Sequence, residues 1–297
     1  MTRRAPIYPK ALKKGDTIGV IAPSSFYDVE KTQPAVDFLE ENGFNVVFHP
    51  QTKLKYGQWA GTPEQKVSAL HEYFENPDIH AIICLVGGNG AIHLLDKIDY
   101  SLIKQNPKIF MGYSDITILL NAIYAKTGLI TFHGPTLSRL NRTDPKYTEQ
   151  MINVLTGQTN SLDIDDDSQC EGILYGGNLS VMQALIGTPH APDLNKAILM
   201  LEDTNDHISR YDRMVTHMAQ AGWLKNLSGI ILGEFIKTQD NPERPYGFTM
   251  EAIIANLAPN TPILKNIPVG HGERLCTLPI GANIVLKDNK LSFKPLV

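Results

Sequence analysis

The chain has 297 residues, of which 42% are hydrophobic and 20% are charged, and its formal net charge is -4 at pH 7. This composition is typical of a soluble protein with two compact domains, and it excludes a disordered or low-complexity chain. The weak negative charge provides no basic surface for phosphate backbones, so we expect no nucleic-acid partner.

The N-terminal segment, MTRRAPIYPKALKKGD, is positively charged but lacks the apolar core and cleavage site of a signal peptide. Because no apolar run approaches the length of a bilayer span, we predict a cytoplasmic protein without a membrane partner. Cys84, Cys170 and Cys276 are widely spaced and form no CxxC or Cys/His cluster. We interpret them as buried thiols and predict neither a metal site nor a cofactor.

Strands and helices alternate through the first half of the chain. GDTIGVIAPSS is typical of a strand that ends in a Pro/Ser turn, and TQPAVDFLEENGF of a helix that ends at Gly43. Further strands are predicted in FNVVFHP, IHAIICLVGG and PKIFMGYS, and further helices in TPEQKVSALHEYFENP, GAIHLLDKI and DITILLNAIYAKTG. Since strands such as Ile79 to Val86 are apolar throughout, residues 1–155 are predicted to form an open α/β domain around a parallel sheet.

The character of the sequence changes after HGPTLSRLNRTDP. Residues 156–176 combine polar turns with the acidic run DIDDDSQ, and we interpret them as a linker with a solvated loop, because the run lacks the spacing of a calcium loop. Residues 177–297 mix the predicted strands KAILMLED, LSGIILGEF and ANIVLKDNKLSFK with a helix from about Ser209 to Gly222. They are expected to form a second, smaller α/β domain.

The first of two notable strand-to-helix turns is LVGGNGAI, which contains Gly87, Gly88 and Gly90. Such turns matter because open parallel sheets bind ligands beyond the carboxyl ends of their strands. Three interpretations stay open from the residues alone: a partial dinucleotide fingerprint in which His93 replaces the third glycine, a tightly packed turn, or an amide that donates to an oxyanion.

The second turn is GYSD, in which a strand delivers Ser114 to the start of a helix. This arrangement is similar to a nucleophile elbow, although Ile116 stands where the usual elbow has a glycine. The alternative is that Ser114 is simply the N-cap of the helix, and the local pattern by itself favours the cap.

A serine nucleophile needs a base, and the base needs a third group to orient it. Glu202 ends an apolar strand in ILMLEDTND, where an unpaired carboxylate would be costly to bury; its alternative role is a cap or a salt bridge, to Arg210 or Arg213. His271 stands between two glycines in IPVGHGERLCTLPIGA, which leaves room for a substrate; its alternative role is that of a structural loop histidine.

Taken together, GYSDIT, TFHGP, GGNLS, LED followed by YDRM, and GHG followed by TLPIGA resemble, in this order, the LD-carboxypeptidase family of serine peptidases. The resemblance implies a flavodoxin-like, class I amidotransferase-like N-terminal domain, with the active site at its junction with a smaller α/β domain. It also implies a homodimer, a catalytic triad of Ser114, Glu202 and His271, and an oxyanion hole formed by the backbone amides of Gly88 and Asp115.

Two activities belong to this family: removal of the terminal D-alanine from cytoplasmic murein tetrapeptides during cell-wall recycling, and cleavage of aminoacyl-nucleotide antibiotics of the microcin C type. The second kind usually carries a longer insertion with an aromatic residue that stacks on adenine. Because the segment after Leu232 is short here, the small muropeptide is the favoured substrate, although Tyr246 and Phe248 offer stacking surfaces. A non-catalytic peptide- or nucleotide-binding protein is the alternative from another class, and a nucleotide-dependent oxidoreductase is disfavoured by His93.

The substrate-binding residues are the least determined part of the site. A free carboxylate calls for an arginine or lysine partner, and the sequence leaves the choice open among Arg139, Arg210, Arg213 and Arg274. Family members often read YRIDRM where this chain has SRYDRM, and Ser209 with Asp212 is predicted to form a capping box there. The residues assigned to substrate binding are Asn89, Tyr113, Arg210 and Arg213.

Overall fold

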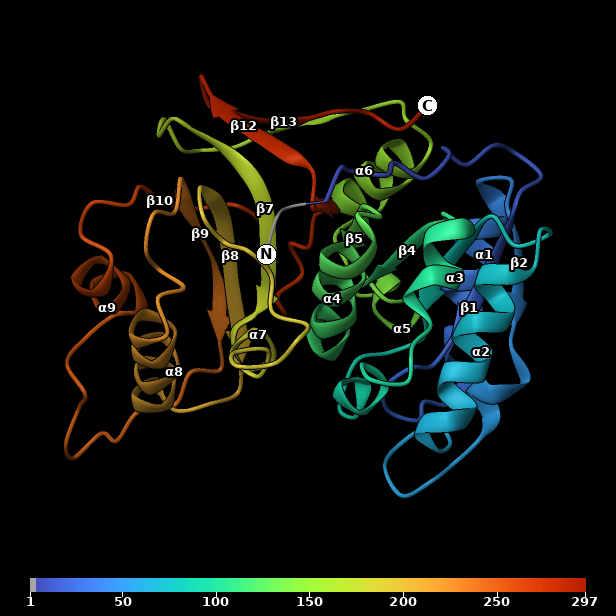
Figure 1. Cartoon of the computed structure of the whole chain (residues 1–297), viewed down its shortest axis with the longest axis horizontal. Helices are drawn as coiled ribbons and strands as arrows, with labels where there is room; N and C mark the ends of the chain where they lie inside the picture. The colour runs from blue at the N-terminus through green and yellow to red at the C-terminus, as the bar shows by residue number, and fades with distance from the viewer. Residues whose placement is uncertain (1–3) are drawn as a thin grey trace.

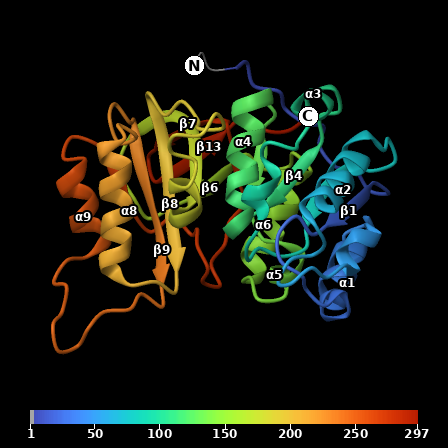
Figure 2. The same ribbon diagram turned by 60° about the horizontal axis from the view of Figure 1, so that its bottom comes forward.

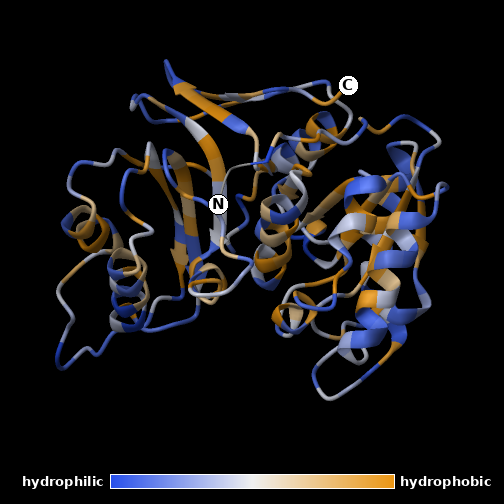
Figure 3. Cartoon of the chain, viewed as in Figure 1, coloured by the Kyte–Doolittle hydropathy of each residue, from blue (hydrophilic) through white to orange (hydrophobic). Residues whose placement is uncertain are grey.

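Two β-sheets form the cores of two α/β halves that lie side by side (Figure 1). The computed structural model describes residues 4–297, and residues 1–3, at the start of the N-terminal segment considered above, lie outside the described part. Hydrophobic residues follow the strands of both sheets (Figure 3), and burial of this apolar surface is the main force that holds each half together.

The first sheet has the strand order β11-β5-β4-β3-β1-β2. Five of its strands are parallel and follow the 2-1-3-4-5 order of a flavodoxin-like sheet, which confirms the predicted fold class. They are β1 (Thr17–Ile21), β2 (Asn45–Phe48), β3 (Ala81–Cys84), β4 (Ile109–Gly112) and β5 (Thr131–His133). Every residue of β3 and β4 is buried, because helices cover both faces of the sheet, and this explains their unbroken apolar sequences.

The helices of the first half are α1 (Gln33–Glu41), α2 (Pro63–Glu75), α3 (Tyr100–Gln105), α4 (Thr117–Thr127), α5 (Leu137–Leu140) and α6 (Pro145–Leu155). The prediction of a helix through GAIHLLDKI is wrong. Only the 3-10 turn Ala91–Leu94 forms there, because Asp99 already caps the next helix, α3. No helix among residues 4–297 is long and apolar enough to cross a membrane.

The second sheet has the order β10-β9-β8-β7-β12-β13-β6. Its strands are β6 (Ser161–Asp163), β7 (Cys170–Asn178), β8 (Ala197–Thr204), β9 (Gly229–Ile236), β10 (Ile263–Leu264), β12 (Asn283–Lys287) and β13 (Lys290–Phe293). Strands β7 to β10 are parallel, whereas β12, β13 and β6 extend the sheet in antiparallel fashion. Its helices are α7 (Leu179–Gln183), α8 (Ile208–Gln220) and α9 (Met250–Leu257).

The segment predicted as a linker, residues 156–176, contains β6 and most of β7, so the expected boundary at residue 176 falls inside a strand. The glycines of β7 are needed for close packing against the neighbouring strand. A Cβ atom on Gly176 would lie 2.0 Å from the carbonyl oxygen of Met200 on β8. The C-terminal part of the chain also contributes a strand to the first sheet, because β11 (Leu278–Ile280) pairs antiparallel with β5.

Two smaller predictions have different outcomes. The capping box of Ser209 and Asp212 is wrong: α8 is capped by His207, whose side chain accepts a hydrogen bond from the Ser209 amide. Buried thiols are confirmed for Cys84 and Cys276, while Cys170 is half-buried, and all three are free.

Helix α4 lies between the two sheets and joins them (Figures 1 and 2). The side-chain amide of Asn121 donates to the Gly176 carbonyl oxygen at 2.9 Å and its oxygen accepts from the Gly176 amide at 3.0 Å. The Thr117 hydroxyl accepts a hydrogen bond from the Asn178 amide at the end of β7. The helix that follows Ser114 is therefore fixed to the second sheet at the level of Glu202, the residue opposite Asn178 on β8.

Candidate active site

Ser114 lies in the turn between β4 and α4, where it begins the 3-10 helix Ser114–Ile116 with a φ of 61°. A left-handed backbone at a residue other than glycine costs on the order of 1–3 kcal/mol and is typical of functional sites, among them the strained turn of a nucleophile elbow. The N-cap position belongs to Tyr113, which makes no side-chain capping bond. The interpretation of Ser114 as an N-cap, which the local pattern favoured, is therefore wrong.

The glycine-rich turn after β3 packs directly against Ser114. A Cβ atom on Gly87 would lie 2.8 Å from the Cβ of Ser114, so only glycine fits at that contact. Gly88 has a φ of 106°, and a Cβ atom there would collide with the Ser25 hydroxyl. Within the described part of the chain, the backbone amides of Gly88 and Asp115 donate to no other group, and both are free to bind a ligand.

Glu202 on β8 and His271 form a hydrogen-bonded pair across the second half. The distance from His271 Nδ1 to Glu202 Oε2 is 2.7 Å, and the Glu202 side chain is fully buried. The alternative salt bridge is not formed, since Arg210 pairs with Asp206 instead. A buried carboxylate needs a partner that offsets its lost hydration, and the imidazole supplies it.

The loop that carries His271 is held by neighbours that the sequence did not assign to it. Arg139 donates to the carbonyl oxygens of His271, at 3.1 Å, and of Gly272. Glu234 accepts a hydrogen bond from the Gly272 amide at 3.1 Å, and burial raises the pKa of this carboxyl. The Tyr113 ring packs on the imidazole with centroids 4.9 Å apart. A carboxylate at the end of the apolar run IILGEF was the signal that could have identified Glu234.

Ser114 and His271 line one cavity of about 170 Å³. Their side chains are not hydrogen-bonded to each other, as is common before a substrate tightens such contacts. Of the predicted substrate-binding residues, Tyr113 lines this cavity, whereas Asn89, Arg210 and Arg213 do not. The other described lining residues are Tyr27, Val86, Gly87, Gly88, Thr136, Ser138, Arg139 and Arg142.

Sequence comparison identifies the family. Residues 18–134 match the family described as the LD-carboxypeptidase N-terminal domain. Residues 171–286 match the family described as the LD-carboxypeptidase C-terminal domain. The probable murein peptide carboxypeptidase of Bacillus subtilis (strain 168) is 35% identical over 298 residues, covering 94% of this chain and 91% of that protein. The chain belongs to the LD-carboxypeptidase family. It is therefore a serine peptidase.

Other proteins that are similar to this chain are named for a different role. The microcin C7 self-immunity protein MccF of Escherichia coli is 30% identical over 333 residues, covering 98% of this chain and 96% of that protein. The crystal structure of an MccF-like protein from Bacillus anthracis str. Ames superposes with a TM-score of 0.83 at 31% identity, covering 98% of this chain and 99% of that one. The alignment with the E. coli protein is longer than this chain of 297 residues, so that protein has inserted segments that are missing here.

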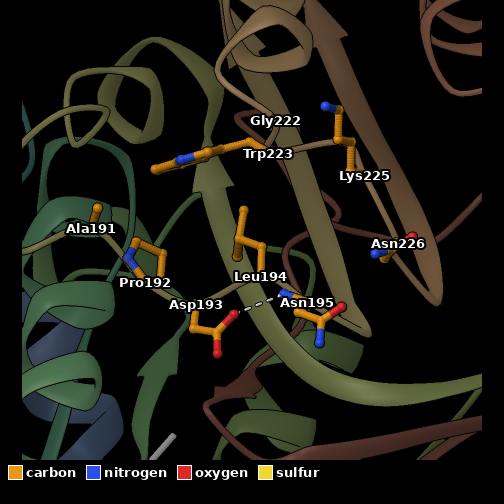
Figure 4. A pocket seen from close by; sticks show the side chains of 9 residues that line it. All are labelled: Ala191, Pro192, Asp193, Leu194, Asn195, Gly222, Trp223, Lys225 and Asn226. Atoms are coloured by element: carbon orange, nitrogen blue, oxygen red, sulfur yellow. Dashed lines mark hydrogen bonds between the residues drawn. The ribbon is translucent and has the colours of Figure 1, made fainter. Parts of the chain in front are cut away.

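A wider hollow of about 520 Å³ lies elsewhere in the second half, between the loops 191–195 and 222–226 (Figure 4). Trp223 and Leu194 form part of its wall, and none of the residues that line it belongs to the pair or to the Ser114 turn. Among its described lining residues, no nucleophile lies beside a base. Among residues 4–297, no group of three or more His, Cys, Asp or Glu side chains is placed to hold a metal ion.

A buried charged cluster connects the turns that flank Ser114. The Asp115 carboxylate accepts hydrogen bonds from the Ser24 hydroxyl and from the Ala91 amide, the latter at 2.9 Å. The fully buried Lys66 of α2 lies with its Nζ 3.3 Å from the Gly90 carbonyl oxygen. Burial lowers the pKa of Lys66 to about 8 against a smaller opposite effect of Asp115, and burial raises the pKa of Asp115. The cluster thus links the turn at Gly90 and Ala91 to Asp115, whose backbone amide is one of the two free amides.

The buried lysine predicts a pH-dependent stability. The pKa of Lys66 is about 8 in the folded protein against 10.5 in the unfolded chain, so the unfolded chain binds more protons between these pH values. The burial penalty is complete below pH 8 and disappears as the pH rises to 10.5. Relative to Lys66→Met, the unfolding free energy of the wild type is expected to rise over this range, by at most about 1.4 kcal/mol per pH unit.

Urea unfolding of both proteins at pH 8, 9 and 10 measures this difference. Lys97→Met removes a half-exposed lysine that pairs with Glu64 and is the matched control, for which we expect no comparable rise. A difference between wild type and Lys66→Met that is constant across the three pH values would contradict a charged lysine buried at this position.

Proposed function

We propose that this LD-carboxypeptidase removes the terminal D-alanine from murein tetrapeptides, cutting the amide between the L-centre of the diamino acid and the D-residue. The observation that carries the proposal is the 2.7 Å bond between His271 and the buried Glu202, with Ser114 in the same cavity as the imidazole. A hydroxyl, a base and an orienting carboxylate are the groups that acyl transfer from an amide requires.

In the proposed mechanism, His271 Nε2 accepts the proton of the Ser114 hydroxyl as the oxygen attacks the scissile carbonyl carbon. Glu202 holds the proton on Nδ1 and stabilises the imidazolium that forms. The amides of Gly88 and Asp115 donate to the oxyanion of the tetrahedral intermediate. His271 then protonates the departing amine of D-alanine, and a water molecule activated by the same imidazole hydrolyses the acyl-enzyme and restores Ser114.

The lengths of the relatives favour a muropeptide over an aminoacyl nucleotide as substrate. The B. subtilis relative named for murein peptides aligns with little excess length, whereas the E. coli immunity protein has inserted segments. The proposal further places the enzyme in the cytoplasm, as a homodimer without cofactor or metal, in the recycling of cell-wall peptides.

The test is hydrolysis of two substrates by the purified protein, followed by mass spectrometry. We expect a murein tetrapeptide to lose D-alanine, and a microcin C type aminoacyl-sulfamoyl adenylate to be cleaved at least about tenfold more slowly, because the compact chain lacks the inserted segments. Cleavage of the adenylate alone would transfer the assignment to antibiotic immunity. Absence of cleavage in both assays would favour the binding-protein alternative.

A further inference from the structure

One wall of the Ser114 cavity is formed by the segment that follows β5. Thr136, Ser138, Arg139 and Arg142 all line it, so this wall presents two hydroxyl groups and two guanidinium groups. Of the described residues that line the cavity, none is an aspartate or a glutamate. The space next to the nucleophile is therefore positively charged and rich in hydrogen-bond donors, which suits an anion.

The protein orients the Arg139 guanidinium group but leaves part of its hydrogen-bonding capacity unused. Its Nη2 donates to the carbonyl oxygens of His271 and Gly272, which fixes the plane of the guanidinium group. Its Nε is buried and has no hydrogen-bond partner among the described residues. Because a buried N–H group without a partner is costly, a site that keeps one is suited to an acceptor that arrives with the ligand.

Arg142 is exposed to solvent and lines the same cavity. Within residues 4–297, its guanidinium group makes no salt bridge and no hydrogen bond, so its charge is available. Burial raises the pKa of Tyr113, and the charges of Arg139 and Arg142 oppose that rise. Both guanidinium groups therefore act on the Tyr113 hydroxyl, beside the His271 ring.

We infer that this wall binds the free α-carboxylate of the leaving D-amino acid, with Arg142 and Arg139 as its ion partners, and that Arg142 determines specificity for a chain end. The inference rests on the proposed function and names the residues that restrict it to carboxypeptidase action. Guanidinium groups pair with carboxylates in a bidentate manner. The volume of about 170 Å³ corresponds to roughly six waters, at about 30 Å³ each, and suits one small residue.

An internal peptide bond offers this wall a neutral amide in place of a carboxylate. Binding would then leave two guanidinium groups without an anion, and sites built around a charged hydrogen bond discriminate strongly against such analogues. A sulfamoyl or phosphoryl anion on the leaving group of an aminoacyl nucleotide has chemistry similar to that of the carboxylate. The wall therefore recognises an anion next to the scissile amide. The test has to distinguish a peptide carboxylate from the sulfamoyl or phosphoryl group of a nucleotide.

The first experiment compares a murein tetrapeptide with the same peptide carrying a C-terminal amide. We expect wild-type kcat/KM to be about 10²-fold lower for the amidated peptide. Arg142→Gln is expected to lower kcat/KM for the free acid by about 10²-fold, chiefly through KM, and to leave the amidated peptide unchanged. Arg142→Lys should restore part of the preference. The matched control is Arg4→Gln, an exposed arginine outside the cavity, which should behave as wild type.

The outcomes distinguish the two proposals. If the wild type cleaves neither peptide, the proposed function fails. If Arg142→Gln then slows cleavage of the aminoacyl-sulfamoyl adenylate, the anion bound by the wall belongs to the nucleotide. If the wild type cleaves the two peptides equally, or Arg142→Gln slows both equally, the carboxylate subsite is overturned.

A binding measurement is independent of turnover. In calorimetric titrations, D-alanine is expected to bind the wild type at least about tenfold more tightly than D-alaninamide, and Arg142→Gln should remove this difference. Equal affinity for the two compounds, or no binding of D-alanine, would overturn the subsite.

Discussion

Ser114→Ala is expected to lower kcat on murein tetrapeptide by about 10⁴-fold or more while the protein remains folded. The change removes only the hydroxyl oxygen, so the oxyanion amides and the substrate contacts persist and give a small residual rate. Release of D-alanine measures activity, and thermal unfolding measures the fold. Ser114→Gly should lose as much activity and be more stable than Ser114→Ala by about 1 kcal/mol, because a φ of 61° strains every residue but glycine.

The control for Ser114 is Ser101→Ala. Ser101 is an exposed serine whose hydroxyl bonds Asp99 at 2.7 Å, and its replacement should leave kcat unchanged. A Ser114→Ala protein that keeps more than a tenth of wild-type activity would contradict the nucleophilic role, and equal stability of the alanine and glycine variants would contradict the strained turn.

Glu202→Gln should lower kcat by about 10³ to 10⁴-fold with little change in KM. Glutamine has the same shape as glutamate and fits the fully buried position, but it cannot stabilise an imidazolium through Nδ1. A neutral amide also allows the wrong tautomer of His271, in which Nε2 carries the proton and cannot accept one from Ser114. Steady-state kinetics on the tetrapeptide measure both parameters.

Glu251→Gln serves as the control for Glu202, because this half-exposed carboxylate on α9 makes only a salt bridge with Lys265. It is expected to leave kcat and KM unchanged. Should Glu202→Gln raise KM without lowering kcat, Glu202 would be a substrate-binding or structural residue instead of the partner of the catalytic base.

The strand and turn at Ser114 show which features a sequence pattern can predict and which it cannot. The run IFMGYS predicted a buried strand that ends at Ser114, and β4 is buried at every position, because apolar strands covered on both faces leave a clear pattern. The same local pattern favoured Ser114 as a cap, which is wrong. A positive φ has no signature in a serine, and neither does the close contact of Gly87 with this turn, because both belong to the tertiary structure.

The positions of the predicted substrate-binding arginines also depend on the tertiary structure. Arg210 and Arg213 stand close to Glu202 in the sequence, yet α8 carries them outside the cavity. Arg139 and Arg142 line the cavity from the segment after β5. Proximity along the chain says little about proximity in space when a parallel sheet brings together turns that are distant in sequence.

Strand and helix periodicity, turn residues and several ordered motifs were enough to predict the flavodoxin-like half, the family and the three candidate catalytic residues. These features depend on near neighbours or on short stretches of chain. The pairing of Glu202 with His271 joins residues 69 positions apart, and it depends on the β7–β8 register and on the loop held by Arg139 and Glu234. Only the tertiary structure decided that pairing, the strain at Ser114 and the charged wall of the cavity, because each arises from packing between segments that no local pattern connects.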